Sequence, residues 1–524
     1  MAEQISDTHD EASRILRALP ARICEVVQPW AERSPDRLAL VEAAGSWTYR
    51  QLREAIADTS IWLQSLGVRP GDRVMIVGEN CRAFAAILLA LTNLDAWPVL
   101  VNARLSTREI DEILDHCGAR RVIYTTSVSP QAKSHALVRR AAITDTAALG
   151  TIGIGPLNQE VQPEHIDSDS ASRVAALIYT SGTTGLPKGV MLTHRNLLFA
   201  AASSAKIRAL SPDDRIYGTL PMSHVAGVSV ALLGPLLSGT AIHVSPRFDP
   251  TSVFKGLEQN RLTVILGAPS MFTLLIEYAR LKGLTCLKSP GLRLISCCGA
   301  PLHPATKLDI ESFFGLTVQN AYGVTECSPN IAQTTIELPR ADTSVGKPIP
   351  GVEVKLVGRD GNPVAVGEVG EMWVRGPNVM KGYYRAQEET AAAIDAEGWF
   401  NTRDLARLVD GNLFVVGRTK DMIVRSGFNV YPAEVEAVLN AHPAVARSAV
   451  IGRTVKGDEE VIAFIQPVSG WTIAAGELAE HAARQLAPYK RPSAILFVPA
   501  MPLTASGKII KDELAKMVGS SAQA

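Results

Sequence analysis

The segment from Tyr179 to Val190 places the strongest constraint on how this chain can fold. It combines three glycines, four serine or threonine residues and one lysine, and it directly follows the apolar run Val174–Ile178. An apolar run of this length is typical of a buried strand. A strand that leads into such a loop presents backbone N–H groups, hydroxyls and a cation to one ligand, which suits a polyphosphate.

The loop differs from a Walker A phosphate loop, which ends in Gly-Lys-Ser or Gly-Lys-Thr. Here Pro187 precedes Lys188 and Gly189 follows it. A flexible turn after a strand is the alternative interpretation, and the glycine, serine and threonine content alone would favour it. The residues expected to bind phosphate are Thr180, Ser181, Gly182, Thr183, Thr184, Gly185 and Lys188.

Strands and helices alternate on both sides of this loop. Thr48 and Gln51 form a capping-box pattern before a helix that is expected to end near Gly67. Residues 127–172 have weak periodicity and are interpreted as a surface connection. Alternation with short, glycine-marked connections predicts parallel α/β layers. The predicted strands span residues 73–77, 98–102, 121–125, 241–244, 263–268 and 292–297.

The length of the apolar segments and the spacing of the glycines change in the last third of the chain. Short segments between closely spaced glycines over 346–375 predict a small β-barrel, and 425–524 has the pattern of a compact α+β module. The predicted fold class is therefore α/β. It comprises a large N-terminal domain of two α/β subdomains plus a small β-barrel, followed by a small α+β C-terminal domain.

Composition excludes several classes of function. The 524 residues contain 52 Lys and Arg against 52 Asp and Glu, so no nucleic-acid footprint is visible. The seven cysteines show no CxxC spacing, which argues against a zinc site or a disulfide framework and favours a cytoplasmic protein. The segment 216–246 lacks charged residues, but polar side chains and Pro235 interrupt it. It predicts a buried helix near 228–237 followed by a strand, and no transmembrane segment.

Six further motifs follow predicted strands or lie in loops. Motifs at the carboxyl ends of parallel strands lie where α/β folds bind ligands. The vicinal pair Cys297-Cys298 invites a redox interpretation, but small wall residues of a substrate channel are the favoured one. The six motifs are Leu220–Gly227, Cys297–Pro301, Asn320–Glu326, Gly398–Leu405, Gly417–Asp421 and Pro502–Ile509.

Together with the loop, and in this order from about Thr48 to Lys508, these motifs resemble the adenylate-forming superfamily. That superfamily contains acyl-CoA synthetases, firefly luciferase and the adenylation domains of peptide synthetases. The resemblance implies that 1–420 is the AMP-binding domain and that 421–524 is a mobile domain hinged at Lys420. It also implies ATP, Mg²⁺ and coenzyme A as ligands.

The resemblance further implies where the nucleotide binds. Tyr322 would stack on adenine, Thr325 would contact the α-phosphate, and Asp404 would accept both ribose hydroxyls, a role that a neutral residue cannot reproduce. Arg418 would lie near ribose and phosphate. The residues expected to bind nucleotide outside the loop are Gly299, Ala300, Pro301, Asn320, Ala321, Tyr322, Gly323, Thr325, Asp404, Arg418 and Lys508.

Four residues are assigned to catalysis on the same resemblance. Lys508 would bridge the substrate carboxylate and the α-phosphate, because a cation lowers the barrier when two anions are brought together. Thr184 and Glu326 would hold Mg²⁺, which prefers oxygen ligands. His224 would form a wall or gate of the acid pocket. Ser426 and Gly427 lie in a stretch that resembles the entry of the CoA pantetheine.

The predicted activity is that of an ATP-dependent carboxylate–CoA ligase that forms an acyl-adenylate and releases AMP and pyrophosphate. The expected pocket residues contain no arginine, which favours an aryl or medium-chain fatty acid and disfavours a second free carboxylate. These residues are His224, Gly227, Val228, Cys297, Cys298, Gly323 and Cys327.

Three alternatives stay open. A stand-alone adenylation enzyme would load the phosphopantetheine of a carrier protein; an amino-acid version would be expected to carry an aspartate near Met222, and none is present. A luciferase-type oxygenase and a non-catalytic nucleotide sensor are the others. We also consider a homodimer.

Overall fold

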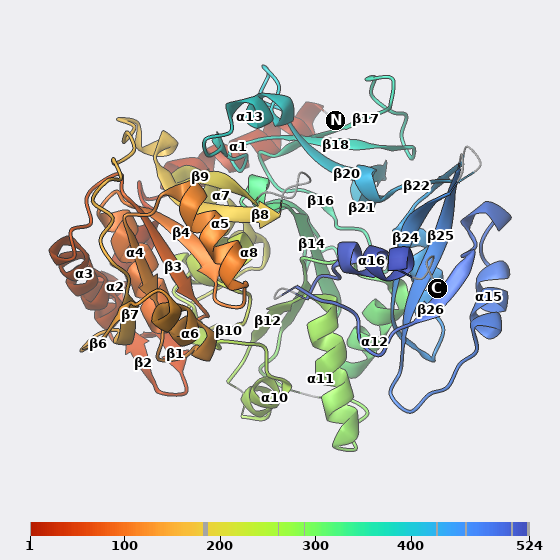
Figure 1. The fold of residues 1–524 in the computed structure, drawn as a ribbon, viewed down its shortest axis with the longest axis horizontal. Coiled ribbons are helices and arrows are strands. Elements are labelled where there is room, and N and C mark those ends of the chain that lie inside the picture. Colours follow the sequence, from red (N-terminus) through yellow and green to blue (C-terminus); the bar gives the residue numbers. More distant parts are fainter. Residues whose placement is uncertain are drawn as a thin grey trace.

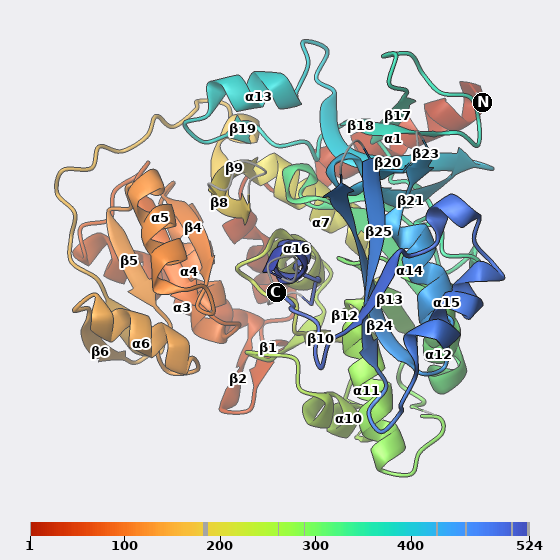
Figure 2. The same ribbon diagram turned by 45° about the vertical axis from the view of Figure 1, so that its right-hand side comes forward.

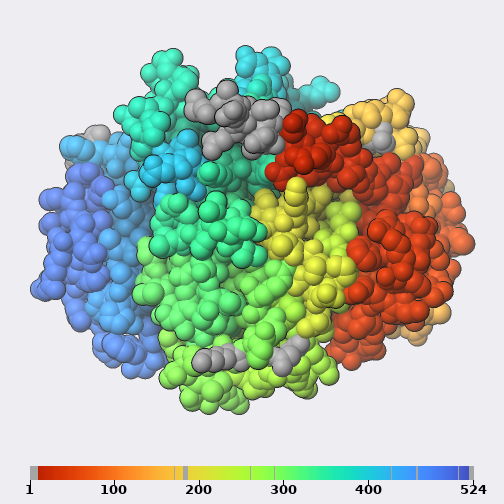
Figure 3. Space-filling model, turned by 180° about the vertical axis from the view of Figure 1, so that it is seen from behind, coloured from red at the N-terminus to blue at the C-terminus, as the bar shows by residue number. Residues whose placement is uncertain are grey.

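The computed structural model describes residues 2–181, 187–259, 261–287, 289–425, 428–455, 458–504 and 507–520. Three parts lie side by side along its longest axis: two sheet-and-helix layers and a small C-terminal module (Figure 1). After a turn of 45° the first layer still stands apart, while the C-terminal module lies in front of the second layer (Figure 2). Seen from behind, the module occupies one end and borders the second layer, while the N-terminal segment coloured red lies towards the other end (Figure 3).

The first layer is a sheet with strand order β19-β9-β8-β4-β3-β5-β7-β6. Its centre, β8-β4-β3-β5, is parallel. The predicted capping box exists, because Thr48 accepts from Gln51 N–H at the start of α3. The strands are β3 (Arg73–Gly78), β4 (Trp97–Asn102), β5 (Arg121–Tyr124), β6 (Ala142–Thr146), β7 (Gly150–Ile154), β8 (Val174–Ser181), β9 (Pro187–Thr193) and β19 (Gly382–Tyr383), and the helices are α3 (Tyr49–Ser65), α4 (Arg82–Asn93), α5 (Thr107–Cys117) and α6 (Pro130–Val138).

The surface connection expected over 127–172 is only partly correct. This stretch contains α6 and the antiparallel pair β6–β7, and β7 extends the first sheet beside β5. Its strands are mostly exposed on their outer side, with β6 exposed at four of its five residues, so they lack the apolar run that identifies a buried strand.

The second layer has strand order β16-β15-β14-β13-β12-β10-β11-β1-β2. Strands β14, β13, β12, β10 and β11 are parallel. The strands are β1 (Leu38–Glu42), β2 (Gly45–Thr48), β10 (Arg215–Gly218), β11 (Ala241–Val244), β12 (Val264–Gly267), β13 (Leu294–Cys297), β14 (Val318–Gly323), β15 (Asn330–Gln333) and β16 (Lys347–Pro348), and the helices are α7 (His194–Ile207), α8 (Val225–Val228), α9 (Gly234–Leu237), α10 (Pro250–Glu258), α11 (Pro269–Leu281) and α12 (Pro304–Phe314).

The N-terminal helices pack on these layers. One apolar cluster contains residues from these helices and from both sheets. The short helices α8 and α9 are joined by a π-helical turn, Ser229–Leu233, so the predicted buried helix begins earlier, at Val225. Among the described residues, no helix is both long and apolar enough to cross a bilayer. The N-terminal helices are α1 (Ala2–Ala18) and α2 (Gln28–Arg33).

The region expected to be a small β-barrel is a four-stranded antiparallel sheet with order β17-β18-β20-β21. Its last strand leads into a short 3-10 turn, Thr419–Asp421, that contains Lys420. The elements here are β17 (Glu353–Val357), β18 (Val369–Arg375), α13 (Gln387–Ala393), β20 (Phe400–Val409) and β21 (Asn412–Arg418).

The C-terminal module has apolar clusters of its own. They are built from residues between Ile423 and Val518, on both faces of the sheet β24-β25-β26. The elements are β22 (Ile423–Arg425), β23 (Phe428–Val430), α14 (Pro432–Asn440), β24 (Val445–Val455), β25 (Asp458–Pro467), α15 (Ala475–Ala483), β26 (Ala494–Phe497) and α16 (Lys511–Ser520).

Candidate active site

The structure joins Tyr322, Asp404 and Arg418 into one cluster. Asp404 and Arg418 face each other on the paired strands β20 and β21, and Arg418 Nε lies 2.9 Å from Asp404 Oδ1. The Tyr322 hydroxyl, at the end of β14, donates to the other carboxylate oxygen. The Asp404 side chain is 4% exposed, and burial raises its pKa while the charge of Arg418 opposes that rise. A buried anion is therefore fixed between one cation and one hydroxyl.

Glu326 lies in the 3-10 turn Thr325–Cys327 directly after β14. The Tyr383 hydroxyl donates to Glu326 Oε1 over 3.0 Å, and burial raises the pKa of the Glu326 carboxyl. Lys188 Nζ lies 5.2 Å from the centre of the Tyr383 ring, on its face. Tyr383 in β19 thus connects the lysine at the end of the predicted phosphate loop to the predicted metal ligand.

Lys508 follows Gly507, which together with Thr504 and Ser270 lines a cleft between the C-terminal module and the second layer. Thr504 N–H donates to the Lys508 carbonyl over 2.8 Å, and the Lys508 N–H donates to Thr504 Oγ1 over 3.1 Å. Burial, followed by the charge of Arg418, lowers the pKa of Lys508, whereas the charges of Asp404, Cys298 and Glu326 raise it. The ammonium group therefore lies among residues of the other layers.

Gly507 lets this turn approach the second layer. Its φ is +83°, and a side-chain carbon added there would lie 2.8 Å from Ser270 Oγ at the start of α11. Glycine meets both requirements at no steric cost.

His224 caps α8 and faces the same cleft. Burial, followed by the charge of Lys508, lowers its pKa to about 4, so the imidazole is neutral near pH 7. A carbon added to Gly227 one turn later would lie 1.9 Å from the Pro221 carbonyl oxygen, so only glycine lets α8 pack on this turn. His224 is positioned as a neutral wall residue.

The pair Cys297-Cys298 divides between the two faces of the sheet. Cys297 is fully buried in the cluster formed with α11 and α12, whereas Cys298 is half-buried and packs on the α7 side. The expectation that Cys297 lines the acid pocket is wrong, because side chains alternate along a strand. The following turn is open, since Gly299 has φ +80° with no atom within 4 Å of an added carbon, and Ala300 and Pro301 continue it.

The motif from Asn320 to Thr325 contains positioning residues as well as candidates for contact. The Asn320 amide donates to the carbonyls of Thr343 and Ser344 over 3.1 and 3.3 Å, so it holds a neighbouring loop. A carbon added to Gly323 would lie 1.8 Å from the Pro329 carbonyl oxygen. Ala321 and Thr325 are buried beside it.

Several predicted residues cannot be placed. The loop positions Gly182, Thr183, Thr184 and Gly185 lie outside the described residues, as do Ser426 and Gly427. Thr180, at the end of β8, pairs with Lys188 of β9, so the two ends of the loop are described and adjacent. Ser181 is the last residue of β8.

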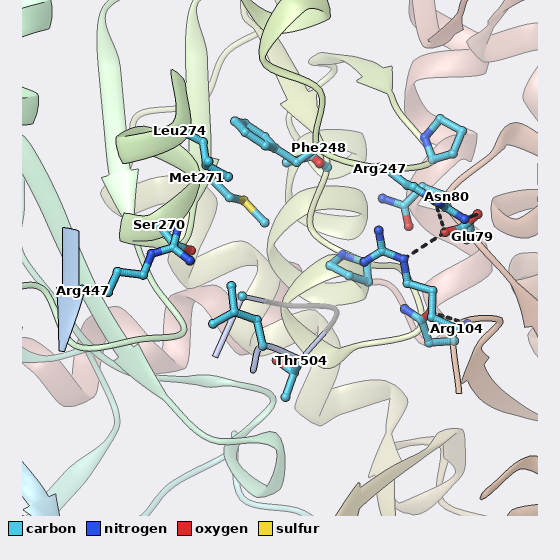
Figure 4. A pocket seen from close by; sticks show the side chains of 16 residues that line it. Glu79, Asn80, Arg104, Arg247, Phe248, Ser270, Met271, Leu274, Arg447 and Thr504 are labelled. Carbon is cyan, nitrogen blue, oxygen red and sulfur yellow. Dashed lines mark hydrogen bonds and ion pairs between the residues drawn. The ribbon is translucent and has the colours of Figure 1, made fainter. Parts of the chain in front are cut away.

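A cavity of about 170 Å³ lies where the C-terminal turn meets the second layer. Figure 4 shows Arg104, Arg247 and Glu79 on one side of it and Arg447 on the other, with Thr504 between. Arg247 Nε lies 2.7 Å from Glu79 Oε1, and Arg104 Nε lies 3.4 Å from the same oxygen. One carboxylate thus faces two guanidinium groups, and the cavity carries excess positive charge.

Comparison with known proteins identifies the family. Residues 27–384 match the model of the AMP-binding enzyme family, and residues 434–508 match that of the AMP-binding enzyme C-terminal domain. The chain belongs to the adenylate-forming acyl-CoA synthetase family. Feruloyl-CoA synthase of Amycolatopsis sp is 35% identical over 499 residues, which cover 93% of this chain and 97% of the relative. Indoleacetate–CoA ligase of Aromatoleum aromaticum is 31% identical over 505 residues, covering 93% and 97%.

Solved structures agree with the synthetase fold. ATP-bound MatB from Rhodopseudomonas palustris superposes with a TM-score of 0.83 at 27% identity, covering 95% of this chain and 99% of that one. The o-succinylbenzoate CoA synthetase MenE from Bacillus subtilis, in complex with ATP and magnesium ion, gives 0.78 at 29% identity, covering 94% and 99%. The protein is therefore an AMP-forming acyl-CoA synthetase with the predicted α/β fold.

The donor set of the synthetase suits a magnesium nucleotide. The part of the chain that the structure describes contains no group of three or more His, Cys, Asp or Glu residues that could hold a metal alone. Mg²⁺ commonly binds one or two carboxylates and takes its other ligands from phosphates and water. Glu326 fits this pattern, and Asp404 with Arg418 fits a ribose beside a phosphate.

Sequence reasoning missed Tyr383, Arg247 and the buried Arg208. Tyr383 is 57 residues away from Glu326 in the chain, and nothing in its own neighbourhood signals the contact. Arg208 offered one signal, a charged residue four positions after Ser204 at the end of an apolar helix.

Proposed function

We propose that this synthetase joins a carboxylic acid to coenzyme A in two steps, with an aryl or medium-chain fatty acid as substrate. In the first step a carboxylate oxygen attacks the α-phosphorus of ATP, and the bond to pyrophosphate breaks. In the second step the CoA thiolate attacks the acyl carbon and AMP leaves. The observation that carries the proposal is the buried cluster of Tyr322, Asp404 and Arg418, together with the approach of the turn that bears Lys508 to Ser270 at the same edge of the second sheet.

Each of these residues has a role in the first step. Lys508 neutralises the charge that builds up between the incoming carboxylate and the α-phosphate. Asp404 accepts the ribose hydroxyls, and Tyr322, which holds Asp404, provides an aromatic face for adenine. Glu326, together with Thr184, would hold Mg²⁺, which would shield the phosphate charges. The neutral His224 excludes water from the acid pocket without taking a proton, because the acid is already ionised.

The second step requires a different arrangement. We propose that the module 421–524 rotates about Lys420, which withdraws Lys508 and brings the Gly427 stretch to the cleft. The turn at Thr419–Asp421 is short, and Met422 N–H donates to the Arg418 carbonyl over 3.1 Å. Few backbone dihedral angles would need to change.

The arginine-lined cavity supports CoA as the acceptor. Arg104 and Arg247 share Glu79, and their remaining donors suit the phosphates of a CoA nucleotide. Arg247→Ala should raise the KM for CoA about 10-fold, with little change in the KM for ATP, because one charge-assisted contact contributes roughly 1.5–3 kcal/mol. Steady-state kinetics with each substrate varied measures both. An equal rise in the two KM values would contradict this use of the cavity.

A screen for pyrophosphate release tests the first step, with ATP, Mg²⁺ and a panel of acids. Parallel assays with free CoA and with a holo carrier protein distinguish the ligase from a stand-alone adenylation enzyme. Thioester on the carrier protein alone would favour that alternative. If none of the acids in the panel supported pyrophosphate release, the proposed substrate range would be contradicted.

Three further expectations remain predictions. They are a role in fatty-acid and lipid metabolism, a cytoplasmic location and a homodimer. Light scattering of the purified protein measures the last of these.

A further inference from the structure

A buried arginine without a counter-ion lies at the C-terminal end of α7. Arg208 is the residue that ends α7, and it is 2% exposed. Its guanidinium donates to the Ser204 carbonyl over 3.4 Å, to the Ser204 hydroxyl, and to Ser296 Oγ over 3.3 Å. Its Nε is buried and has no hydrogen-bond partner. None of the ion pairs among the described residues includes Arg208.

A structural role alone does not account for this arrangement. Buried arginines are normally paired, because an uncompensated charge in a protein interior costs several kcal/mol. Arg293, which lies nearby, is paired in this way: its Nη2 lies 2.6 Å from Asp214 Oδ2. Burial lowers the pKa of Arg208 only to about 10, so the group is charged near pH 7. The protein keeps a desolvated cation whose partners are two serines.

Arg208 and the turn that bears Lys508 both approach the carboxyl ends of the neighbouring strands β12 and β13. Ser296 and Cys298 are two residues apart at the end of β13, so their side chains lie on the same face of the sheet. Cys298 N–H donates to the Gly267 carbonyl over 3.0 Å, and the Cβ of the next residue, Ala268, lies 3.7 Å from a carbon added to Gly507 beside Lys508. An acid whose carboxylate meets Lys508 would extend along Cys298, with its far end towards Arg208.

We infer that Arg208 forms the far end of the acid pocket, and that the substrate is a carboxylic acid with a second oxygen acceptor at its remote end. This inference rests on the proposed function, because it takes the cleft beside Lys508 and Cys298 as the acid site. A second carboxylate supplies both charge and two acceptor oxygens, whereas a phenol or ketone supplies an acceptor alone. The order of preference is carboxylate, then hydroxyl or ketone, then methyl. Arg208 thereby revises the expectation that a second carboxylate is disfavoured.

Matched acids test this inference on the wild-type enzyme. One series is hexanoate, 6-hydroxyhexanoate and adipate; the other is benzoate, 4-hydroxybenzoate and terephthalate. We expect kcat/KM for pyrophosphate release to be at least about 10-fold higher for the acceptor-bearing acids, because a site built to bind a polar group discriminates against its absence. A preference for hexanoate and benzoate would overturn the inference. Comparing 6-hydroxyhexanoate with adipate, and 4-hydroxybenzoate with terephthalate, shows whether the site prefers a hydroxyl or a carboxylate.

Two variants separate recognition from structure. Arg208→Met keeps the length of the side chain and removes its charge, whereas Arg208→Lys keeps the charge. In Arg208→Met, kcat/KM should fall about 100-fold for the acceptor-bearing acid and stay constant or rise for its methyl or unsubstituted analogue. Arg208→Lys should retain part of the preference. An equal loss for all acids in Arg208→Met would mean a structural role and would overturn the inference.

An error in the proposed function and an error in the role of Arg208 would give different results. If the proposed function is wrong, no acid in either series gives pyrophosphate and a CoA thioester. If only the role of Arg208 is wrong, the enzyme forms thioesters but does not favour a remote acceptor. Should Arg208→Met fail to fold, the wild-type series still decides.

Discussion

The two sides of the active-site cleft are held in different ways. On one side, Asp404 is buried between Arg418 of the paired strand β21 and Tyr322 of β14 in the second layer, and each of its oxygens has one of these partners. On the other side, Lys508 is supported by a single tight turn of a module with its own apolar core. The proposed nucleotide site is therefore held together within the N-terminal part of the chain, whereas the proposed catalytic cation belongs to the C-terminal module. This difference suits an enzyme that needs the cation in one step and not in the other.

The largest effect is expected when the charge of Lys508 is removed. Lys508→Ala should lower pyrophosphate release by about 10²–10³-fold, the usual cost of losing one stabilising group at a reacting centre. Thioester formation from supplied acyl-AMP should be largely kept. Arg484→Ala is the control, because this exposed cation lies in the same module. An equal loss of pyrophosphate release and of thioester formation would contradict a role for Lys508 in the first step alone.

The proposed nucleotide site is tested by Asp404→Asn, which keeps the shape and removes the charge. Arg418 would lose its counter-ion, and the ribose site would lose an acceptor oxygen. We expect kcat/KM for ATP to fall about 10–100-fold, corresponding to roughly 1.5–3 kcal/mol for a hydrogen bond to a charged group. The loss should appear with every acid. An effect that depends on the acid would place Asp404 in the acid pocket instead.

A smaller effect is expected at Tyr383. Tyr383→Phe removes the hydrogen bond to Glu326 and should lower pyrophosphate release at limiting Mg²⁺ by up to about 10-fold, the usual range for a neutral donor. Tyr384→Phe is the matched control, because the neighbouring hydroxyl bonds to Glu164 instead. If both variants behave alike, Tyr383 does not support the metal site.

The pH profile should show no contribution from His224. Its pKa is lowered to about 4, so it takes a proton only as the pH falls towards that value, and it stays neutral between about pH 5 and 8. His224→Asn should leave the shape of the profile unchanged over this range. Lys508 has a lowered pKa, so pyrophosphate release should decline on the alkaline side at a lower pH than for a free lysine. An inflection near pH 6.5 that disappears in His224→Asn would contradict the first point.

Local signals made much of the fold predictable. The capping pair Thr48 and Gln51 begins α3, and the glycine after α5, Gly118, ends that helix in the left-handed conformation. Buried parallel strands such as β3 are continuous apolar runs, so they are visible in one sequence. The hairpin β6–β7 is not visible in this way, because β6 is exposed at four of its five residues and β7 is interrupted by glycines.

Contacts between residues far apart in the chain could not be predicted from the sequence. The resemblance to a family named Asp404, Arg418 and Lys508, but the tyrosine that supports Glu326 comes from an edge strand that no motif marks. Arg208 was overlooked because a charged residue after a helix is normally exposed. Its burial depends on how α7 lies against β13, which local pattern does not specify.

The tight fit of Gly507 against Ser270 has a consequence for the timing of catalysis. An alanine at position 507 would be strained at a φ of +83° and would crowd Ser270 Oγ, so it would disturb the approach of this turn to the start of α11. We expect Gly507→Ala to lower pyrophosphate release more than it lowers thioester formation from supplied acyl-AMP.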